Sequence, residues 1–339
     1  MSELSDLLDA AEALAARGEP MALATIVTTR GSTYRRAGAR LLIPANGEPI
    51  GNISGGCLEG DVARLGREVI VSGVPRLVEF DLTADDDAVW GYGLGCNGAM
   101  ELLVEPTPGA LETVAALRTG SGRCLVTPLT GPGAGSHRFE TDGAAAAALR
   151  DGSPRVEEVA GQRVFFEPML PPFRLVVCGA GHDAIPLVRQ AADLGWRVLV
   201  ADVRRALLNG ERFPGAAAFS AADPAQAAAE LTPDARTAVV LMSHNYLRDI
   251  AYLGALLDSP LAYLGVLGPR GRTEQMLGEM GRSEAIARLH APAGLDIGAE
   301  GPEEVAHAIV AEILAVTRGR EGGPLRDRGA PIHGGEAPA

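Results

Sequence analysis

The sequence contains few cysteines, and their spacing matches neither a disulfide scaffold nor a zinc site. The 339 residues include four cysteines, at positions 57, 96, 124 and 178. Small secreted domains have a denser cysteine pattern, and structural zinc sites have Cys-x-x-Cys pairs. We therefore expect reduced thiols and no structural zinc.

Basic clusters and long hydrophobic runs are also missing. The formal net charge is −13, and an acidic chain without a basic patch is not expected to bind nucleic acid or acidic lipid surfaces. No apolar stretch approaches the roughly 20 residues of a membrane helix. The N-terminus lacks the charged and then apolar pattern of a signal peptide. We expect a cytoplasmic protein, with no membrane insertion, that acts with a small molecule or another protein.

The length predicts two domains with a connecting region between them. Residues 1–106 predict an α/β domain with a mixed sheet, which begins with an amphipathic helix that ends near Gly18. Residues 107–172 include a stretch, up to about Arg155, that is rich in Gly, Ala, Pro and Thr and has 123–127 as its only strand-like piece, and the prolines of 165–172 are expected to break regular structure. We interpret them as a connecting region that carries an alanine-rich helix. The glycine- and proline-rich residues 319–339 are expected to form a disordered tail.

Residues 173–318 predict a Rossmann-like domain with a doubly wound parallel sheet. An apolar strand at 174–178 leads into Gly-Ala-Gly-His-Asp-Ala at 179–184 and then a helix, and the next strand, 197–201, ends in an acid. In such a unit the glycines let a pyrophosphate approach the helix N-terminus, and the acid binds a ribose hydroxyl. The binding candidates are Gly179, Gly181, His182 and Asp202.

Two further strands, near 237–242 and 261–267, deliver His244 and Arg270 to the edge where open α/β sheets bind ligands. His244 can be an acid/base group, a ligand contact, or a histidine bonded to a loop carbonyl. Asp202 at its strand end favours a free ribose diol over a 2′-phosphate, which suits NAD-like or cytidine-type ligands better than NADP.

Two glycine-rich loops, 51–59 and 91–98, each present one cysteine, Cys57 and Cys96. Apolar residues recur at helical spacing after Cys57, so its thiol is expected at a helix N-terminus, where the helix dipole lowers a thiol pKa. The alternative is that these cysteines are buried and inert, as cysteines often are. The candidates here are Cys57 and Cys96, with Gly55 and Gly56 beside the first thiol.

A loop at 29–40 concentrates arginine in an otherwise acidic chain. Guanidinium groups in such a loop suit bidentate recognition of phosphate or carboxylate. The alternative is a solvated loop whose arginines contact acidic neighbours. The candidates are Arg30, Ser32, Arg35 and Arg36.

Taken together, these motifs resemble the XdhC/CoxI family of accessory proteins. The resemblance rests on motifs in order along both domains: Gly-Ser-Thr at 31–33, Arg-Ala-Gly-Ala at 36–39, Gly-Gly-Cys-Leu-Glu at 55–59, Gly-Cys at 95–96, Cys-Gly-Ala-Gly-His at 178–182, Gly-Pro-Arg at 268–270 and His-Ala-Pro-Ala-Gly-Leu-Asp-Ile-Gly-Ala at 290–299. It departs from the family pattern at Asn97, Pro269 and Ala293.

The resemblance implies a protein that binds the molybdenum cofactor, as molybdopterin or its cytosine dinucleotide form. Such a protein protects the cofactor while a cysteine desulfurase supplies the sulfido ligand, and hands it to a xanthine dehydrogenase-type molybdenum hydroxylase. A binder of this cofactor needs a soft thiolate near the metal and an anion site for the phosphate. Cys57 and Cys96 are candidates for contacting molybdenum or carrying a transferable sulfur. The arginine loop or the Gly179 loop can supply the anion site.

Two other classes of function are open. The Rossmann-like domain also fits an NAD- or flavin-linked oxidoreductase, and it fits a nucleotide-sensing interaction protein without catalysis. We expect a cofactor chaperone rather than a turnover enzyme, because the oxidoreductase hypothesis assigns no function to the first domain. A homodimer is a further expectation, since a two-fold interface is a common way to close a cleft around a labile cofactor.

Overall fold

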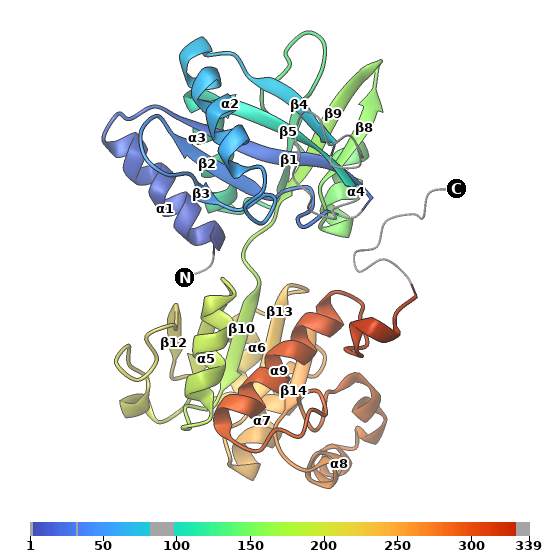
Figure 1. Ribbon diagram of the computed structural model, residues 1–339. Coiled ribbons are helices and arrows are strands. Elements are labelled where there is room, and N and C mark those ends of the chain that lie inside the picture. The colour runs from blue at the N-terminus through green and yellow to red at the C-terminus, as the bar shows by residue number, and fades with distance from the viewer. Residues whose placement is uncertain (1–2, 32, 82–97, 330–339) are drawn as a thin grey trace. The chain divides into compact units, whose positions relative to one another are not determined.

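The computed structural model describes residues 3–31, 33–81 and 98–329. Ser32 and Cys96 lie outside the described residues, so their predicted roles stay predictions. The chain divides into two compact units, one up to Pro171 and the other from Pro172, drawn in Figure 1. Of the expected tail, residues 319–329 are described and mostly exposed, with one 3₁₀ turn, η4 (Leu325–Asp327).

The first unit begins with a five-stranded sheet in the order β3-β2-β1-β5-β4. All of its strand pairs are antiparallel, so the domain is α/β as predicted but its sheet is not mixed. The direction of a strand is set by its partners, which periodicity does not reveal. The strands are β1 (Met21–Gly31), β2 (Arg40–Pro44), β3 (Ile50–Gly51), β4 (Arg76–Asp81) and β5 (Gly98–Pro106).

Helices cover both faces of this sheet. Ala22, Ala24 and Ile26 of β1 pack in the same cluster as α2 (Glu59–Ser72). The alternate residues, Met21 and Leu23, pack with α1 (Glu3–Ala16) and α3 (Thr107–Thr119). Successive strand side chains point to opposite faces, which is why β1 reads as one continuous apolar run.

Residues 107–172 contain much more structure than a connecting region. A second antiparallel sheet, in the order β7-β6-β9-β8, is packed against α4 (Gly143–Asp151). Its members are β6 (Arg123–Pro128), β7 (Arg138–Glu140), β8 (Arg155–Val159) and β9 (Gln162–Met169). Strands β8 and β9 form a hairpin around Ala160 and Gly161, both with positive φ. Such a two-residue turn favours tight hairpins. The sequence did not predict this hairpin, because β8 is rich in charged residues and β9 contains a proline.

Ionic contacts join the two sheets of the first unit. Arg40 on β2 contacts Glu167 on β9 at 2.5 Å, and Arg163 on β9 holds Glu101 on β5 with two hydrogen bonds, at 2.8 and 2.5 Å. These contacts tie the segment expected to be a linker to the first sheet.

A third contact pairs His137 Nε2 with Glu105 on β5 at 2.8 Å, and both side chains are less than 5% exposed. Thr127 Oγ1 lies 2.8 Å from the other ring nitrogen. Burial alone would lower the pKa of His137, but the hydrogen bond and charge of Glu105 outweigh it and raise the pKa.

The second unit is a parallel sheet in the order β12-β11-β10-β13-β14. One face packs against α5 (Ala184–Asp193) and α9 (Pro302–Thr317), and the other against α6 (Ala227–Leu231), α7 (Tyr246–Leu256) and α8 (Arg270–Glu279). This confirms the doubly wound prediction. The strands are β10 (Arg174–Cys178), β11 (Arg197–Ala201), β12 (Ala218–Ser220), β13 (Thr237–Leu241) and β14 (Tyr263–Val266).

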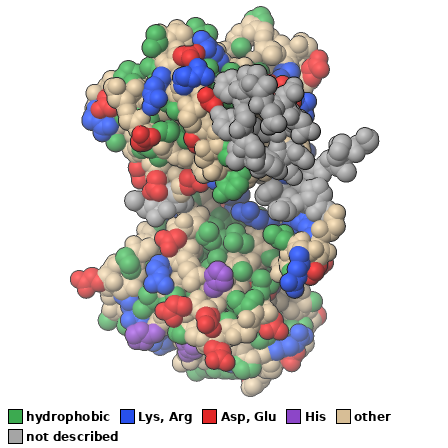
Figure 2. All heavy atoms as spheres, viewed as in Figure 1, with side chains coloured by type: hydrophobic (Ala, Val, Ile, Leu, Met, Phe, Trp, Pro, Cys, Tyr) green, Lys and Arg blue, Asp and Glu red, His purple; other side chains and the backbone are tan. Residues whose placement is uncertain are grey.

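Within the described ranges, no helix is long and apolar enough to cross a membrane. On the face shown in Figure 2, arginine side chains are interspersed with acidic ones over the described surface.

The His137–Glu105 pair makes the stability of the first unit depend on pH. A raised histidine pKa contributes stability that is fully present below the unfolded pKa of about 6.5 and is lost as pH rises through the folded pKa. We expect the unfolding temperature of the wild type to fall more between about pH 6 and pH 9 than that of His137→Gln. Calorimetry measures this, with the exposed His307→Gln as the control. Parallel pH curves for the wild type and His137→Gln would contradict it.

Candidate functional site

Cys57 lies in the loop between β3 and α2, two residues before the helix begins at Glu59. Its side chain is half-buried and packs at the margin of the core under α2. Gly55 and Gly56 have φ of 82° and 110°, a conformation that glycine adopts most readily. A Cβ on Gly56 would meet nothing within 4 Å. The half-buried thiol therefore lies just before a helix start, beside two glycines with positive φ.

The carboxylate of Glu59 occupies most of the donor groups in this loop. It accepts hydrogen bonds from the backbone N–H groups of Ile53 (3.1 Å), Ser54 (2.9 Å), Gly56 (3.0 Å) and Leu58 (3.2 Å), and from the Ser54 hydroxyl. Burial alone would raise the pKa of Glu59, but these hydrogen bonds outweigh it and lower the pKa. These four backbone N–H groups of the loop are thus already satisfied by the chain itself.

Most arginines of the 29–40 loop also have acidic partners. Arg30 pairs with Glu79, Arg35 donates to both oxygens of Glu3 at 2.8 and 3.0 Å, and Arg40 pairs with Glu167, as above. For these three, the alternative of a loop with acidic neighbours is what the structure shows.

Arg36 differs from the other arginines of the loop. Its Nη1 donates to Thr29 Oγ1 at 3.3 Å, and its Nε is buried without a hydrogen-bond partner. Among the residues that the structure describes, no carboxylate is paired with this guanidinium. Arg40 Nε is also buried without a hydrogen-bond partner, so what separates Arg36 from the other arginines of the loop is the lack of a carboxylate partner among the described residues.

Tyr34 brings the arginine loop and the Cys57 loop together. A Cβ on Gly55 would lie 3.5–3.6 Å from three atoms of the Tyr34 ring, and Tyr34 is 62% exposed. Neither Tyr34 nor Glu59 was singled out from the sequence. The signal for Glu59 was its place three residues after Gly56, in the first turn of a helix, where acids cap.

The residues around Cys57 fit a metal that brings its own ligands. No group of three or more His, Cys, Asp or Glu side chains that could hold a metal ion occurs among the described residues. A single soft thiol suits a metal already bound by a dithiolene, and Arg36 suits a phosphate.

At the carboxyl edge of the second unit, Gly179 is required by a close approach. Its φ is 134°, and a Cβ would lie 2.3 Å from the carbonyl oxygen of Met242, which follows β13. Gly181 lies beside His244, whose Cδ2 would be 3.6 Å from a Cβ there. The glycine loop and the end of β13 are therefore neighbours, as predicted.

Asp202, the acid after β11, is 3% exposed and fully engaged within the chain. It accepts hydrogen bonds from the backbone N–H of Ala180 (2.8 Å), and from the backbone N–H (2.8 Å), Nε (3.0 Å) and Nη2 (2.6 Å) of Arg204. Burial alone would raise the pKa of Asp202, but these bonds outweigh it and lower the pKa. The structure does not show the acid facing an open ribose site.

The other predicted residues of this edge have separate surroundings. His244 Nε2 contacts Asp183 Oδ2 at 2.5 Å, rather than a loop carbonyl, and its φ is 54°. His182 is exposed in the glycine loop. Arg270 donates to Glu274 at 2.7 Å, one turn along α8, and is solvent-exposed. Asp183 was missed because acids in a helix-start loop are read as caps.

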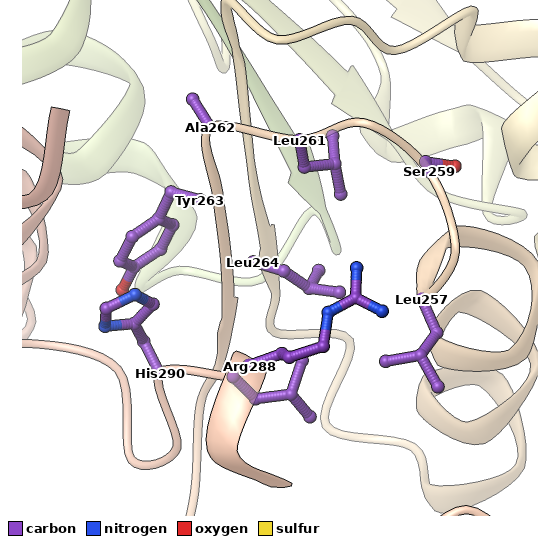
Figure 3. A pocket seen from close by; sticks show the side chains of 9 residues that line it. Leu257, Ser259, Leu261, Ala262, Tyr263, Leu264, Arg288 and His290 are labelled. Atoms are coloured by element: carbon purple, nitrogen blue, oxygen red, sulfur yellow. The ribbon is translucent and has the colours of Figure 1, made fainter. Parts of the chain in front are cut away.

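A small pocket lies beside β14 and contains none of the predicted site residues (Figure 3). On one side of it the rings of Tyr263 and His290 are stacked, with centroids 4.3 Å apart. Glu312 of α9 accepts from the Tyr263 hydroxyl at 2.6 Å and from the backbone N–H of Gly294 at 2.8 Å, and contacts His290 Nδ1 at 3.1 Å. The 290–294 motif therefore anchors a segment against the edge strand.

Comparison with known proteins identifies the family. The model of the XdhC and CoxI family matches residues 14–81, and that of the XdhC Rossmann domain matches residues 175–313. The chain is 34% identical over 323 residues to a Bacillus subtilis protein described as a probable xanthine dehydrogenase subunit, covering 89% of this chain and 95% of the relative. The chain belongs to the XdhC and CoxI family, which confirms the resemblance.

Two further likenesses are informative. The molybdenum cofactor insertion chaperone PaoD of Escherichia coli is 26% identical over 304 residues, 88% of this chain and 84% of that protein. A solved structure described as a xanthine dehydrogenase from Bacillus halodurans superposes with a TM-score of 0.78 at 31% identity, covering 95% of this chain and 97% of the other.

The network around Glu59 predicts the effect of removing its charge. An amide offers one acceptor oxygen where the carboxylate offers two, so Glu59→Gln leaves loop donors unsatisfied, at a cost of about 1–3 kcal/mol in unfolding free energy. We expect the same variant to alkylate faster at Cys57, because the loop loses its fixed position. Urea unfolding and iodoacetamide labelling measure the two effects, and the exposed Glu68→Gln on the same helix is the control. Unchanged stability and labelling would show that Glu59 does not hold the loop.

Proposed function

We propose that this protein binds the molybdenum cofactor, protects it during sulfuration, and delivers it to a xanthine dehydrogenase-type molybdenum hydroxylase. Two relatives support this by name, one as a molybdenum cofactor insertion chaperone and one as a probable xanthine dehydrogenase subunit. The observation that carries the proposal is the meeting of two loops at Tyr34 and Gly55. It brings together the segment of a half-buried thiol and the segment of Arg36, whose guanidinium has no carboxylate partner among the described residues.

Cys57 is the proposed contact for the cofactor's metal centre or the carrier of a transferable sulfur. The cofactor is cargo here and brings its own dithiolene, so one soft sulfur from the protein is sufficient. Cys96, outside the described residues, stays a second candidate for the same role.

Arg36 is the proposed contact for the cofactor's phosphate. Arg30 and Arg35 already bind Glu79 and Glu3, so they would have to give up these partners to bind a ligand. Arg36 has its guanidinium without a carboxylate and its Nε without an acceptor. A phosphate suits a guanidinium that has no carboxylate partner.

The proposal includes two partner proteins, the target hydroxylase and a cysteine desulfurase, and a cytoplasmic location. It leaves the bound form as molybdopterin or its cytosine dinucleotide, and it includes a homodimer as a means of closing the cofactor site. A chaperone with these features hands over its ligand and does not turn over a substrate. An oxidoreductase that binds the free ribose diol of NAD through Asp202 gains no support, because Asp202 is held by Arg204.

Cofactor loading tests the proposal. The protein is incubated with molybdenum cofactor under anaerobic conditions, and molybdenum and pterin are measured after gel filtration. We expect near-stoichiometric metal and pterin in the wild type and loss of both in Cys57→Ser. Arg36→Gln should bind the cofactor roughly tenfold more weakly, because it removes a charged phosphate contact worth about 1.4 kcal/mol.

Arg35→Gln is the matched control, since it changes a neighbouring arginine whose guanidinium is already paired with Glu3. It should bind the cofactor like the wild type. Full loading of Cys57→Ser with both metal and pterin would overturn the role of Cys57. Equal weakening by Arg35→Gln and Arg36→Gln would overturn the special role of Arg36.

A further inference from the structure

We infer that the glycine loop of the second unit binds a ligand with a phosphomonoester group, received by Arg204 with Arg212 and Arg248, and that it discriminates against a free ribose diol. This reverses the expectation drawn from Asp202 alone. The inference concerns the Rossmann unit and does not depend on the proposed role of Cys57.

The first step is the state of Asp202. A ribose diol is recognised when a carboxylate accepts hydrogen bonds from its hydroxyl groups. Here both carboxylate oxygens are taken, Oδ2 by the Ala180 N–H and Arg204 Nη2, and Oδ1 by the backbone N–H and Nε of Arg204. Two of these bonds join opposite charges in a place that is almost closed to water. Neutral hydroxyl groups would have to displace charge-assisted hydrogen bonds, which are the stronger kind.

The second step is the number of positive groups at this point. Arg204 follows β11, Arg248 comes from α7, and Arg212 precedes β12. Arg248 Nη1 lies 3.9 Å from Asp202 Oδ1. Arg212 Nη2 donates to the carbonyl oxygen of Ala180 at 3.2 Å, and its Nε is buried without a partner. Three guanidiniums from three segments thus gather around residue 180 of the loop and the acid at 202.

The third step concerns the remaining charges of the loop. Asp183 is the loop's own acid, and it contacts His244 rather than any of these arginines. The three arginines therefore keep an excess of positive charge after Asp202 is counted. A doubly charged phosphomonoester suits such a cluster, because several N–H donors can share its oxygens.

The fourth step is access. The Arg204 side chain is 42% exposed and that of Arg248 is 32% exposed, whereas Asp202 is buried beneath them. A ligand arriving from solvent therefore meets guanidinium groups before it can meet the acid. The sequence contains no lysine, so all 30 basic residues are arginines, and each offers a planar fork of donors that matches a phosphate.

Two sources of a phosphomonoester fit this chemistry. One is the 2′-phosphate of an NADP-type dinucleotide, which an arginine near the second strand of a Rossmann unit accommodates. The other is the terminal phosphate of a phosphorylated pterin. Both present a doubly charged phosphate on a single ester bond, and the experiment separates them.

Isothermal titration of the full chain with NADP⁺, NAD⁺ and molybdopterin tests the inference. If the source is the dinucleotide, NADP⁺ should bind at least about tenfold more tightly than NAD⁺, and Arg204→Gln should abolish the difference. If the source is the pterin, titration should still detect molybdopterin binding to Cys57→Ser, too weak to survive gel filtration, and Arg204→Gln should lower that affinity about tenfold further. This background keeps the result separate from the cofactor-loading test.

Two further variants make the test specific. Arg205→Gln removes the adjacent exposed arginine and should leave every affinity unchanged. Arg248→Gln leaves the bonds of Asp202 to Ala180 and Arg204 in place, so it should weaken the phosphorylated ligand severalfold without lowering the unfolding temperature. This keeps the test decisive should Arg204→Gln fail to fold.

Binding of NAD⁺ as tight as that of NADP⁺, or tighter, would overturn the inference. Failure of all three ligands to bind in the Cys57→Ser background would also overturn it, and would assign Arg204 to closing the loop on Asp202. Equal losses with Arg204→Gln and Arg205→Gln would reduce the arginines to a diffuse charge effect and reject a specific site.

Discussion

Both units depend on a carboxylate that satisfies the backbone of a glycine loop. Glycine loops leave N–H groups without partners inside the chain, and unsatisfied buried donors are costly. In the first unit Glu59 accepts four such N–H groups, and in the second Asp202 accepts that of Ala180. The same solution in two unrelated folds positions Cys57 at one loop and the arginine cluster at the other. It also means that a ligand must compete with the chain for these donors.

Outside the apolar cores, ion pairs between arginines and carboxylates connect the elements of the structure. The buried pair of Arg40 with Glu167 and the more exposed pair of Arg163 with Glu101 connect the two sheets of the first unit. A buried ion pair adds little net stability over an apolar contact, but losing one partner leaves a buried charge and is costly. Such a pair therefore contributes more to fixing how the two sheets are arranged against each other than to the net stability of the unit. The same reasoning applies to Asp202, which would be an unpaired buried charge without Arg204.

The sequence predicted the fold best where backbone geometry alone decides the residue type. Gly179 had to be glycine because a Cβ would collide with the carbonyl of Met242, and this requirement appears in the sequence as the Rossmann turn. The sheet at 123–169 was missed because its strand β8 is charged and half exposed, so no apolar run marked it.

The sites were predicted less completely than the fold. Residue types at a motif were visible, but which side chain meets which was not. The arginine loop contains four arginines that look equivalent in the sequence, and the structure separates Arg36 from the three that have carboxylate partners. Asp202 looked free because its partner, Arg204, is an ordinary surface residue in the sequence. Long-range pairs such as Arg30 with Glu79 depend on sheet register, which one sequence does not encode in a local pattern.

The burial of the other thiols determines where the protein is first oxidised on exposure to air. Cys124 and Cys178 are fully enclosed, and burial raises the pKa of each, that of Cys124 to about 12. Peroxide attacks thiolates that it can reach, so of the cysteines within the described residues only Cys57 is open to it. Oxidation would therefore begin at Cys57 in the glycine loop while both cores stay intact. A preparation that is fully folded can already have an oxidised thiol at that loop.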